Sequence, residues 1–166
     1  MRAWLEFTQE FLSFALYTSD MRYSLLVLTI AVGLAGDKKV KMKDLPAPVR
    51  QAVETLSKSS TIVGLAKEVE DGKTMYEAET KVNGKTRDVT IDEQGKIVMT
   101  EDEVAIDSIP AAARAAIEKE AAGGGKITLV EKVTKGSDVK YEAAITPKSG
   151  KKKEVSFNAE GVAVKW

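Results

Sequence analysis

An internal repetition limits the fold of this chain more than any other feature. The segment that begins at Leu45 (LPAPVRQAVE) and the one that begins at Ile109 (IPAAARAAIE) share Pro, Ala, Arg, Ala and Glu at a constant offset of 64 positions. Further matches follow in the same order: Val69 with Val133, Tyr76 with Tyr141, and Gly95 with Gly161. The offset grows only where turns are expected, and turns tolerate insertions. The series predicts a tandem duplication, with one copy at 40–104 and a second at 105–166.

Each copy is expected to open with a helix. Pro46 and Pro110 suit a first helical turn, where the missing N–H has no partner to lose. Asp44 and Ser108 lie just upstream, where a short polar side chain can accept from a free helix N–H. Apolar residues then recur at helical spacing in both copies: Val49, Ala52, Val53 and Leu56, then Ala113, Ala116 and Ile117. The glycines at 123–125 are expected to end the second helix.

Four strands are expected after each helix, because apolar and polar residues alternate. The residues expected to face the helix are Val63, Leu65, Val69, Tyr76 and Val89, with Ile127, Leu129, Val133, Tyr141 and Val155 in the second copy. Val98 marks the fourth strand of the first copy, and Val162 and Val164 mark that of the second. Asn83-Gly84 predicts a tight hairpin. The predicted class is α+β: two tandem repeats, each a helix followed by a four-stranded antiparallel meander. Joining the two sheets into one larger sheet would cover two exposed edges.

Composition excludes several functions. Of 166 residues, 25 are Lys or Arg and 25 are Asp or Glu, so the chain lacks the positive excess of a general nucleic-acid binder. There is no Cys and no His, which removes disulfides, thiolate chemistry, the usual general base and the commonest metal ligand. A carboxylate-pair hydrolase would need a cleft that shifts a pKa, and no aromatic cleft wall accompanies the acidic residues. We predict no catalytic residue, no cofactor and no enzyme activity.

The N-terminal region has the pattern of an export signal. Met21 and Arg22 precede an apolar run at 25–35, which is followed by the polar Gly36-Asp37. The run is as long as the apolar part of a signal peptide and short for a membrane span. We predict a signal peptide at 21–36, a periplasmic or secreted product, and no membrane association after cleavage. A buried core helix is the alternative. Residues 1–20 are either upstream sequence translated by mistake or an amphipathic helix.

The repeated motifs resemble the PepSY-like family, which is grouped with the β-lactamase-inhibitor-like (BLIP-like) fold. The resemblance lies in the LPAPVRQAVE opening at Leu45 and its echo at Ile109, the two Tyr-Glu-Ala strands, and the turns at Gly95 and Gly161. It implies a secreted or periplasmic protein of small α+β repeats. Relatives include propeptide segments that restrain metallopeptidases and inhibitors that hold a β-lactamase in a concave sheet. No partner-contacting motif of those inhibitors can be matched, and their disulfide is absent.

The face of the sheet turned away from the helix is the candidate binding surface. Alternation places these candidate partner-binding residues on it: Glu77, Glu79, Asp88, Lys140, Glu142, Lys152 and Glu154. The expected partner is an extracytoplasmic protein, with a peptidase or another hydrolase as a candidate. The competing interpretation is a solvated face with ion pairs between neighbouring strands. The alternative function is an envelope carrier or sensor of a small ligand or cation.

Two acidic runs are the best candidates for a calcium site. These are Asp92-Glu93 and Glu101-Asp102-Glu103, but neither has the ligand spacing of a calcium loop. The sequence therefore predicts no metal, and the run at 101–103 is interpreted as a solvated linker. Trp166 is expected to pack on the second helix. Function is expected where the copies differ, at 101–103, 123–125 and 147–153.

Overall fold

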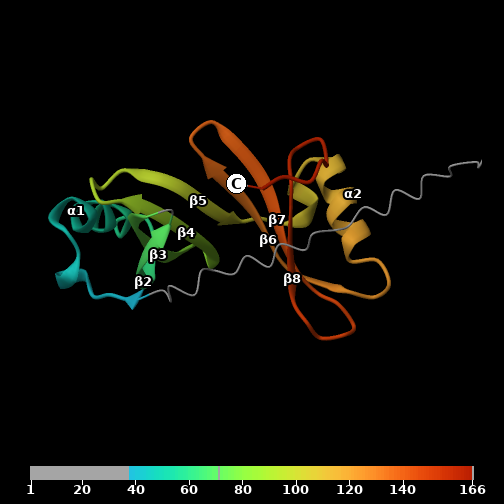
Figure 1. Ribbon diagram of the computed structural model, residues 1–166, viewed down its shortest axis with the longest axis horizontal. Coiled ribbons are helices and arrows are strands. Elements are labelled where there is room, and N and C mark those ends of the chain that lie inside the picture. Colours follow the sequence, from blue (N-terminus) through green and yellow to red (C-terminus); the bar gives the residue numbers. More distant parts are fainter. Residues whose placement is uncertain (1–37, 71, 166) are drawn as a thin grey trace, which may run out of the picture.

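The computed structural model describes residues 38–70 and 72–165. The predictions for the signal peptide, for residues 1–20 and for Trp166 lie outside these residues. The fold is α+β, with two α-helices and one eight-stranded antiparallel sheet whose strands follow the chain order from β1 to β8 (Figure 1). Neither α-helix of the described residues is long and apolar enough to cross a membrane.

In each half of the chain a 3-10 helix and an α-helix precede a series of antiparallel strands, four strands in the first half and three in the second. The first half contains β1 (Lys38–Lys39), the 3-10 helix η1 (Met42–Asp44), α1 (Ala47–Leu56), β2 (Thr61–Glu70), β3 (Lys73–Val82), β4 (Lys85–Asp92) and β5 (Ile97–Glu103). The second half contains the 3-10 helix η2 (Ile106–Ser108), α2 (Ala111–Glu120), β6 (Lys126–Lys135), β7 (Asp138–Thr146) and β8 (Lys153–Phe157). The strands β5 and β6 pair from Thr100↔Thr134 to Glu103↔Glu131, so the predicted joining of two sheets into one is confirmed.

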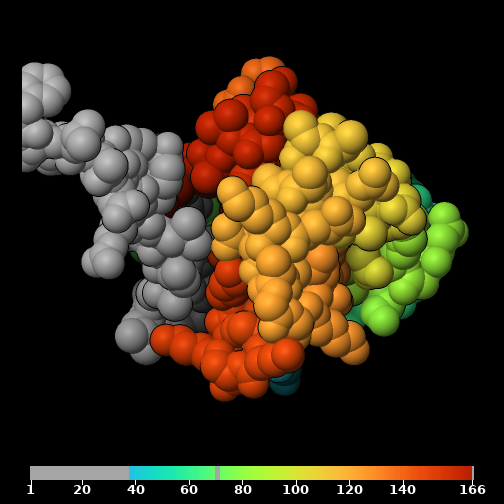
Figure 2. Space-filling view, turned by 90° about the vertical axis from the view of Figure 1, so that its right-hand side faces the viewer, coloured from blue at the N-terminus to red at the C-terminus, as the bar shows by residue number. Residues whose placement is uncertain are grey.

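Both helices pack on the same face of the sheet. Val49 and Val53 of α1 are buried with Tyr76 and Ile91, and Ile117 of α2 is buried in a second core. That second core also holds Ala113, Ala143, Ile145 and Phe157. Thr100 of β5 lies opposite Val89 of the first core on one side and opposite Thr134 of β6 on the other. Thr134 lies on the same face of β6 as Val130 of the second core, so both cores are on one face of the sheet. Figure 1 shows α1 and α2 at opposite ends of the molecule, and Figure 2 shows the surface of the end at which α2 lies.

The helix starts differ from the predicted caps. Pro46 and Pro110 occupy the N-cap positions, and neither α-helix has a side-chain cap. The cap prediction for Asp44 and Ser108 was wrong because both residues belong to the preceding 3-10 turns; the Ser108 hydroxyl donates instead to the Ala105 carbonyl at 2.6 Å.

The repeated glycines fix the contact between sheet and helix. Gly95 and Gly161 have φ of 80° and 76°, a conformation that glycine adopts without strain. A Cβ on Gly95 would lie 2.5 Å from the Pro48 carbonyl oxygen, and one on Gly161 would lie 2.6 Å from that of Ala112. Each turn therefore reaches the first turn of its own helix only because its glycine has no side chain.

Several strand predictions were wrong. Register shifts between Ile62 and Gly64 and between Ile127 and Leu129 break the alternation of β2 and β6. A bulge of this kind inserts one residue, which a count of alternating residues cannot detect. Leu129 and Val133 consequently lie on the face turned away from the helices, and Val63 is largely exposed. The fourth strand of the second copy is also missing, since Ala163 makes only an isolated bridge to Phe157.

Candidate binding face

The face of the sheet opposite the two helices, here called the open face, carries a row of carboxylates. The pairing registers place at least one acidic residue from each of the strands β2 to β8 on it. We call these residues the carboxylate row: Glu68, Glu77, Asp88, Glu101, Glu131, Glu142 and Glu154. Because neighbouring strands lie about 4.8 Å apart, the row crosses almost the whole width of the sheet.

Parts of the open face are buried. Ala66, Val133 and Lys140 all lie on it, and neither helix core includes them. Their exposed fractions are nevertheless only 6%, 0% and 7%. Side chains beside them on the open face are therefore partly desolvated.

Like charges face each other across neighbouring strands of the open face. Asp88 lies directly opposite Glu79 on β3 and opposite Glu101 on β5. Glu131 lies directly opposite Glu103 and Glu142 in the same way. Directly opposed like charges destabilise a sheet. The expected ion pairs between neighbouring strands are thus replaced by repulsive pairs at the centre of this face.

Burial and this repulsion shift the acid–base equilibria of the row. Burial raises the pKa of Glu77 to about 9, assisted by a hydrogen bond with the Glu68 carboxyl and by the nearby Asp88 and Glu101 charges. Burial, with repulsion from neighbouring carboxylates, raises the pKa of Glu101 and of Glu131 to about 7 each. Burial and the charge of Glu79 also raise the pKa of Asp88. Glu77, Asp88, Glu101 and Glu131 therefore hold protons more tightly than carboxylates in water do.

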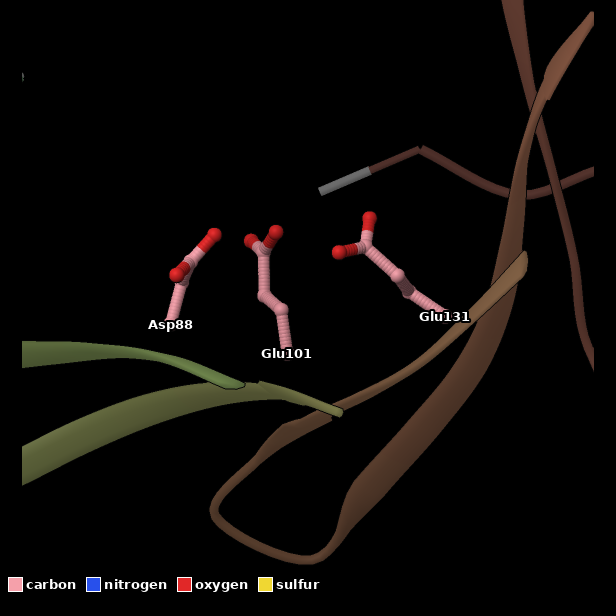
Figure 3. A group of neighbouring side chains, drawn as sticks. All are labelled: Asp88, Glu101 and Glu131. Atoms are coloured by element: carbon pink, nitrogen blue, oxygen red, sulfur yellow. The ribbon is translucent and has the colours of Figure 1, made fainter. Parts of the chain in front are cut away.

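Three members of the row converge at the join between the two halves. One carboxylate oxygen each from Asp88, Glu101 and Glu131 lies within 4.8 Å of the other two. Figure 3 shows the three side chains standing side by side and pointing the same way from β4, β5 and β6. Carboxylate oxygens are the ligands that Ca²⁺ prefers. Sequence reasoning missed this group because the three residues come from separate strands and form no contiguous loop.

The acidic runs singled out in the sequence have other roles. The Asp92 carboxylate accepts from the backbone N–H of Gln94 at 3.0 Å and of Lys96 at 2.9 Å, which stabilises a turn. The run at 101–103 lies inside β5 and is not a linker. Alternation splits it between faces: Asp102 pairs with Arg87 on the helix side, while Glu103 on the open face accepts from the Thr86 N–H at 2.9 Å.

Most of the candidate partner-binding residues lie where alternation placed them. Those on the open face are Glu77, Glu79, Asp88, Lys140, Glu142 and Glu154. Lys152 is exposed but precedes β8, outside the paired strand. Lys140, expected to be solvated, is buried, and its Nζ lies 2.7 Å from the Glu142 Oε1. The residues missed were Glu68, Glu101 and Glu131. The bulge in β6 hid the register of Glu131, whereas the alternation of Leu65 and Val69 already places Glu68 on the open face.

A groove adjoins the row at the first edge of the sheet. Its volume is about 440 Å³, and it runs along β1 and β2. Its charged lining residues are Lys39 of β1 and Glu77 and Glu79 of β3. Gly64 lies in its lining, and a Cβ there would come within 2.7 Å of the Glu79 carboxylate. This glycine therefore lets the Glu79 side chain lie across the backbone of β2.

Solved structures share this fold. A protein of Bacteroides eggerthii proposed to be periplasmic is 19% identical, with a TM-score of 0.59 over 73% of this chain and 86% of that one. A DUF2874 family protein of Bacteroides uniformis is 21% identical, with a TM-score of 0.57 over 72% and 86%. A BLIP-like protein of Bacteroides fragilis is 19% identical, with a TM-score of 0.51 over 73% and 84%. The chain thus has a BLIP-like α+β fold.

No protein family matches this sequence, and no curated protein is recognisably similar to it. At these identities the structural likeness extends to the fold, and the chemistry of the open face must be argued from its own residues.

Proposed function

We propose that this chain is an exported, non-catalytic binding protein that recognises another extracytoplasmic protein through its open face. The observation that carries the proposal is the carboxylate row on the partly buried face that neither helix covers. Half-buried carboxylates that oppose one another cost folding energy. A partner that brings compensating groups would recover this energy on binding.

The form of the surface favours a macromolecular partner over a small apolar ligand. The groove found here lies at the β1–β2 edge and is flanked by Lys39, Glu77 and Glu79, whereas the two cores between sheet and helices are filled by apolar side chains. A row that crosses seven strands is also wider than one small ligand needs. The regular element order of the two halves supports the further proposal that 40–104 and 105–166 are copies of one PepSY-like unit.

Site-directed photo-crosslinking tests the binding role without depending on charge. A photoreactive residue is placed at Thr90, which is half-buried at the centre of the open face, and, in a control protein, at Gln51, which is exposed on α1. Both proteins are expressed from the full chain in the native cell. We expect a discrete crosslinked protein from position 90 that is absent from position 51. Equal labelling from both positions, or none from position 90, would contradict the proposal.

A cation sensor is the second candidate function. Its support is the convergence of Asp88, Glu101 and Glu131 within 4.8 Å at the join of the two halves. Calorimetric titration with calcium alone checks it: binding that Glu101→Gln abolishes and Glu118→Gln, on the exposed side of α2, leaves unchanged would favour the sensor. Heat changes that are the same in both variants would rule it out.

A further inference from the structure

The second half of the molecule contains its own lysine in the open face. In β7, Lys140 precedes Glu142 by two residues, so both lie on the same face, and the ammonium nitrogen is 2.7 Å from the carboxylate. Glu142 also accepts from the Ser156 hydroxyl at 2.8 Å. Lys140 lies directly opposite Val133, which is fully buried. A methylene stem over an apolar residue with the charged head on a carboxylate is a favourable geometry for lysine.

The corresponding place in the first half lacks this lysine. In β3, Glu77 directly follows Tyr76, just as Glu142 directly follows Tyr141 in β7. Glu77 lies opposite Thr90, and Glu142 lies opposite Ser156. Two residues before Glu77, however, stands Met75 in place of Lys140. The residue opposite Met75 is Glu68, where the second half has Val133. The strand register therefore matches Val133 with Glu68, and the match of Val69 with Val133 predicted from the sequence is wrong. At this equivalent place the first half therefore has one positive charge fewer and one negative charge more than the second half.

Three carboxylates of the first half, Glu68, Glu77 and Asp88, have no ion pair with another described residue. Within 38–70 and 72–165, the ion pairs are Arg87–Asp102, Arg114–Asp107, Lys140–Glu142 and Lys153–Glu120, and none involves Glu68, Glu77 or Asp88. Half-buried carboxylates without a cation are expensive in free energy. The groove along β1 and β2 opens beside Glu77 and Glu79, so an extended segment has a route to this place.

We propose that Glu68, Glu77 and Met75 form a receptor for a lysine or arginine side chain of a cationic polypeptide, which takes the place that Lys140 fills in the second half. The aliphatic stem of the incoming side chain lies on Met75, and its charged head lies between the Glu68 and Glu77 carboxylates. Arginine can engage two carboxylates at once through its planar guanidinium. This inference rests on the proposed protein-binding role of the open face and names the chemistry of its partner.

The decisive variant is Met75→Lys, which gives the first half the lysine of the second. Oligoarginine and oligolysine serve as probes, and fluorescence anisotropy measures their affinity at low salt, about 50 mM, where charge interactions are least screened. We expect Met75→Lys to weaken oligoarginine binding about tenfold or more, because its own ammonium fills the receptor. Glu77→Gln should weaken binding in the same sense. Thermal melts of both variants verify that they fold.

Charge-matched controls separate a receptor from general attraction. Gln51→Lys and Glu54→Gln make the same charge changes on the exposed side of α1, and we expect them to change affinity less than about twofold. Equal losses in Met75→Lys and Gln51→Lys would overturn the inference, as would the absence of oligoarginine binding to the unaltered chain. Calcium binding that Met75→Lys removes, without any oligoarginine binding, would assign the place to a divalent ion and also overturn it.

Failure here differs from failure of the proposed function. If a protein crosslinks from position 90 but neither oligocation binds, the open face binds a partner of other chemistry. If crosslinking from position 90 also fails, the protein-binding role itself is refuted.

Discussion

The two halves of this molecule agree on the helix side of the sheet and differ on the open face. On the helix side, Val53 and Ile117 occupy matching places, and the turn glycines Gly95 and Gly161 contact the matching helix turns. On the open face, the first half has Glu68 and Met75 where the second has Val133 and Lys140. Packing constrains the first set, because a core tolerates little change in volume. No helix packs on the open face, so packing constrains it less and its differences are more informative about function.

The largest expected effect tests whether the two halves fold as one unit. Ile117→Ala should lower the free energy of unfolding by about 3–4 kcal/mol, and Val53→Ala by about 2 kcal/mol, because both side chains are almost completely buried. Urea unfolding should show a single transition in each variant, since β5 and β6 join the halves into one sheet. If a variant instead showed two transitions and the midpoint urea concentration of only one was lowered, the two halves would unfold independently.

The buried lysine comes next. Lys140→Met should lower the free energy of unfolding by about 3 kcal/mol, because it leaves Glu142 without its cation in a nearly buried setting. Lys152→Met is the matched control: Lys152 is exposed, and its loss should change stability by less than about 0.5 kcal/mol. Denaturant titration measures both. Equal small effects would mean that Lys140 does not stabilise the second half.

The pH dependence of stability should separate the halves in another way. The Glu77 carboxyl, whose pKa rises from 4.5 to about 9 on folding, stabilises the folded state fully at pH values below its ordinary pKa of 4.5. That contribution is lost as the pH rises through the range up to 9. Glu77→Gln removes the titrating group and should raise the melting temperature near the upper end of this range by about 5 °C. Near the lower end it should have little effect.

Thermal melts over this pH range make the measurement. Glu118→Gln, which removes an exposed carboxylate from α2, is the control and should leave the pH profile unchanged. If Glu77→Gln and Glu118→Gln give the same profile, the carboxylates of the first half are solvated and their burial has no energetic consequence.

The smallest expected effect concerns the two edges of the sheet. Lys38 and Lys39 form the β1 edge, and Lys151 and Lys152 precede the β8 edge. Lysines on edge strands prevent pairing between molecules. Replacing Lys151 and Lys152 by Thr should leave the melting temperature within about 2 °C while increasing self-association in sedimentation experiments. A variant that stays monomeric at high concentration would show that this edge needs no charge protection.

The sequence alone determined that an α-helix precedes antiparallel strands in each half, the inward position of Tyr76, the hairpin at Asn83-Gly84 and the side of the sheet on which most candidate residues lie. These features depend on local rules, namely helix periodicity, strand alternation and the backbone freedom of glycine. Local rules failed at the bulges of β2 and β6, where one extra residue reverses the face of everything that follows.

Only the tertiary structure decided which charges meet. The opposition of Asp88 to Glu101 depends on the pairing of β4 with β5. The approach of Glu131 to both residues depends on the pairing of β5 with β6, and the burial of Lys140 depends on its neighbours in the folded sheet. Strands distant in sequence come together there, and no local pattern records their register. Electrostatic energy depends on distance and on burial, and both are properties of the folded sheet.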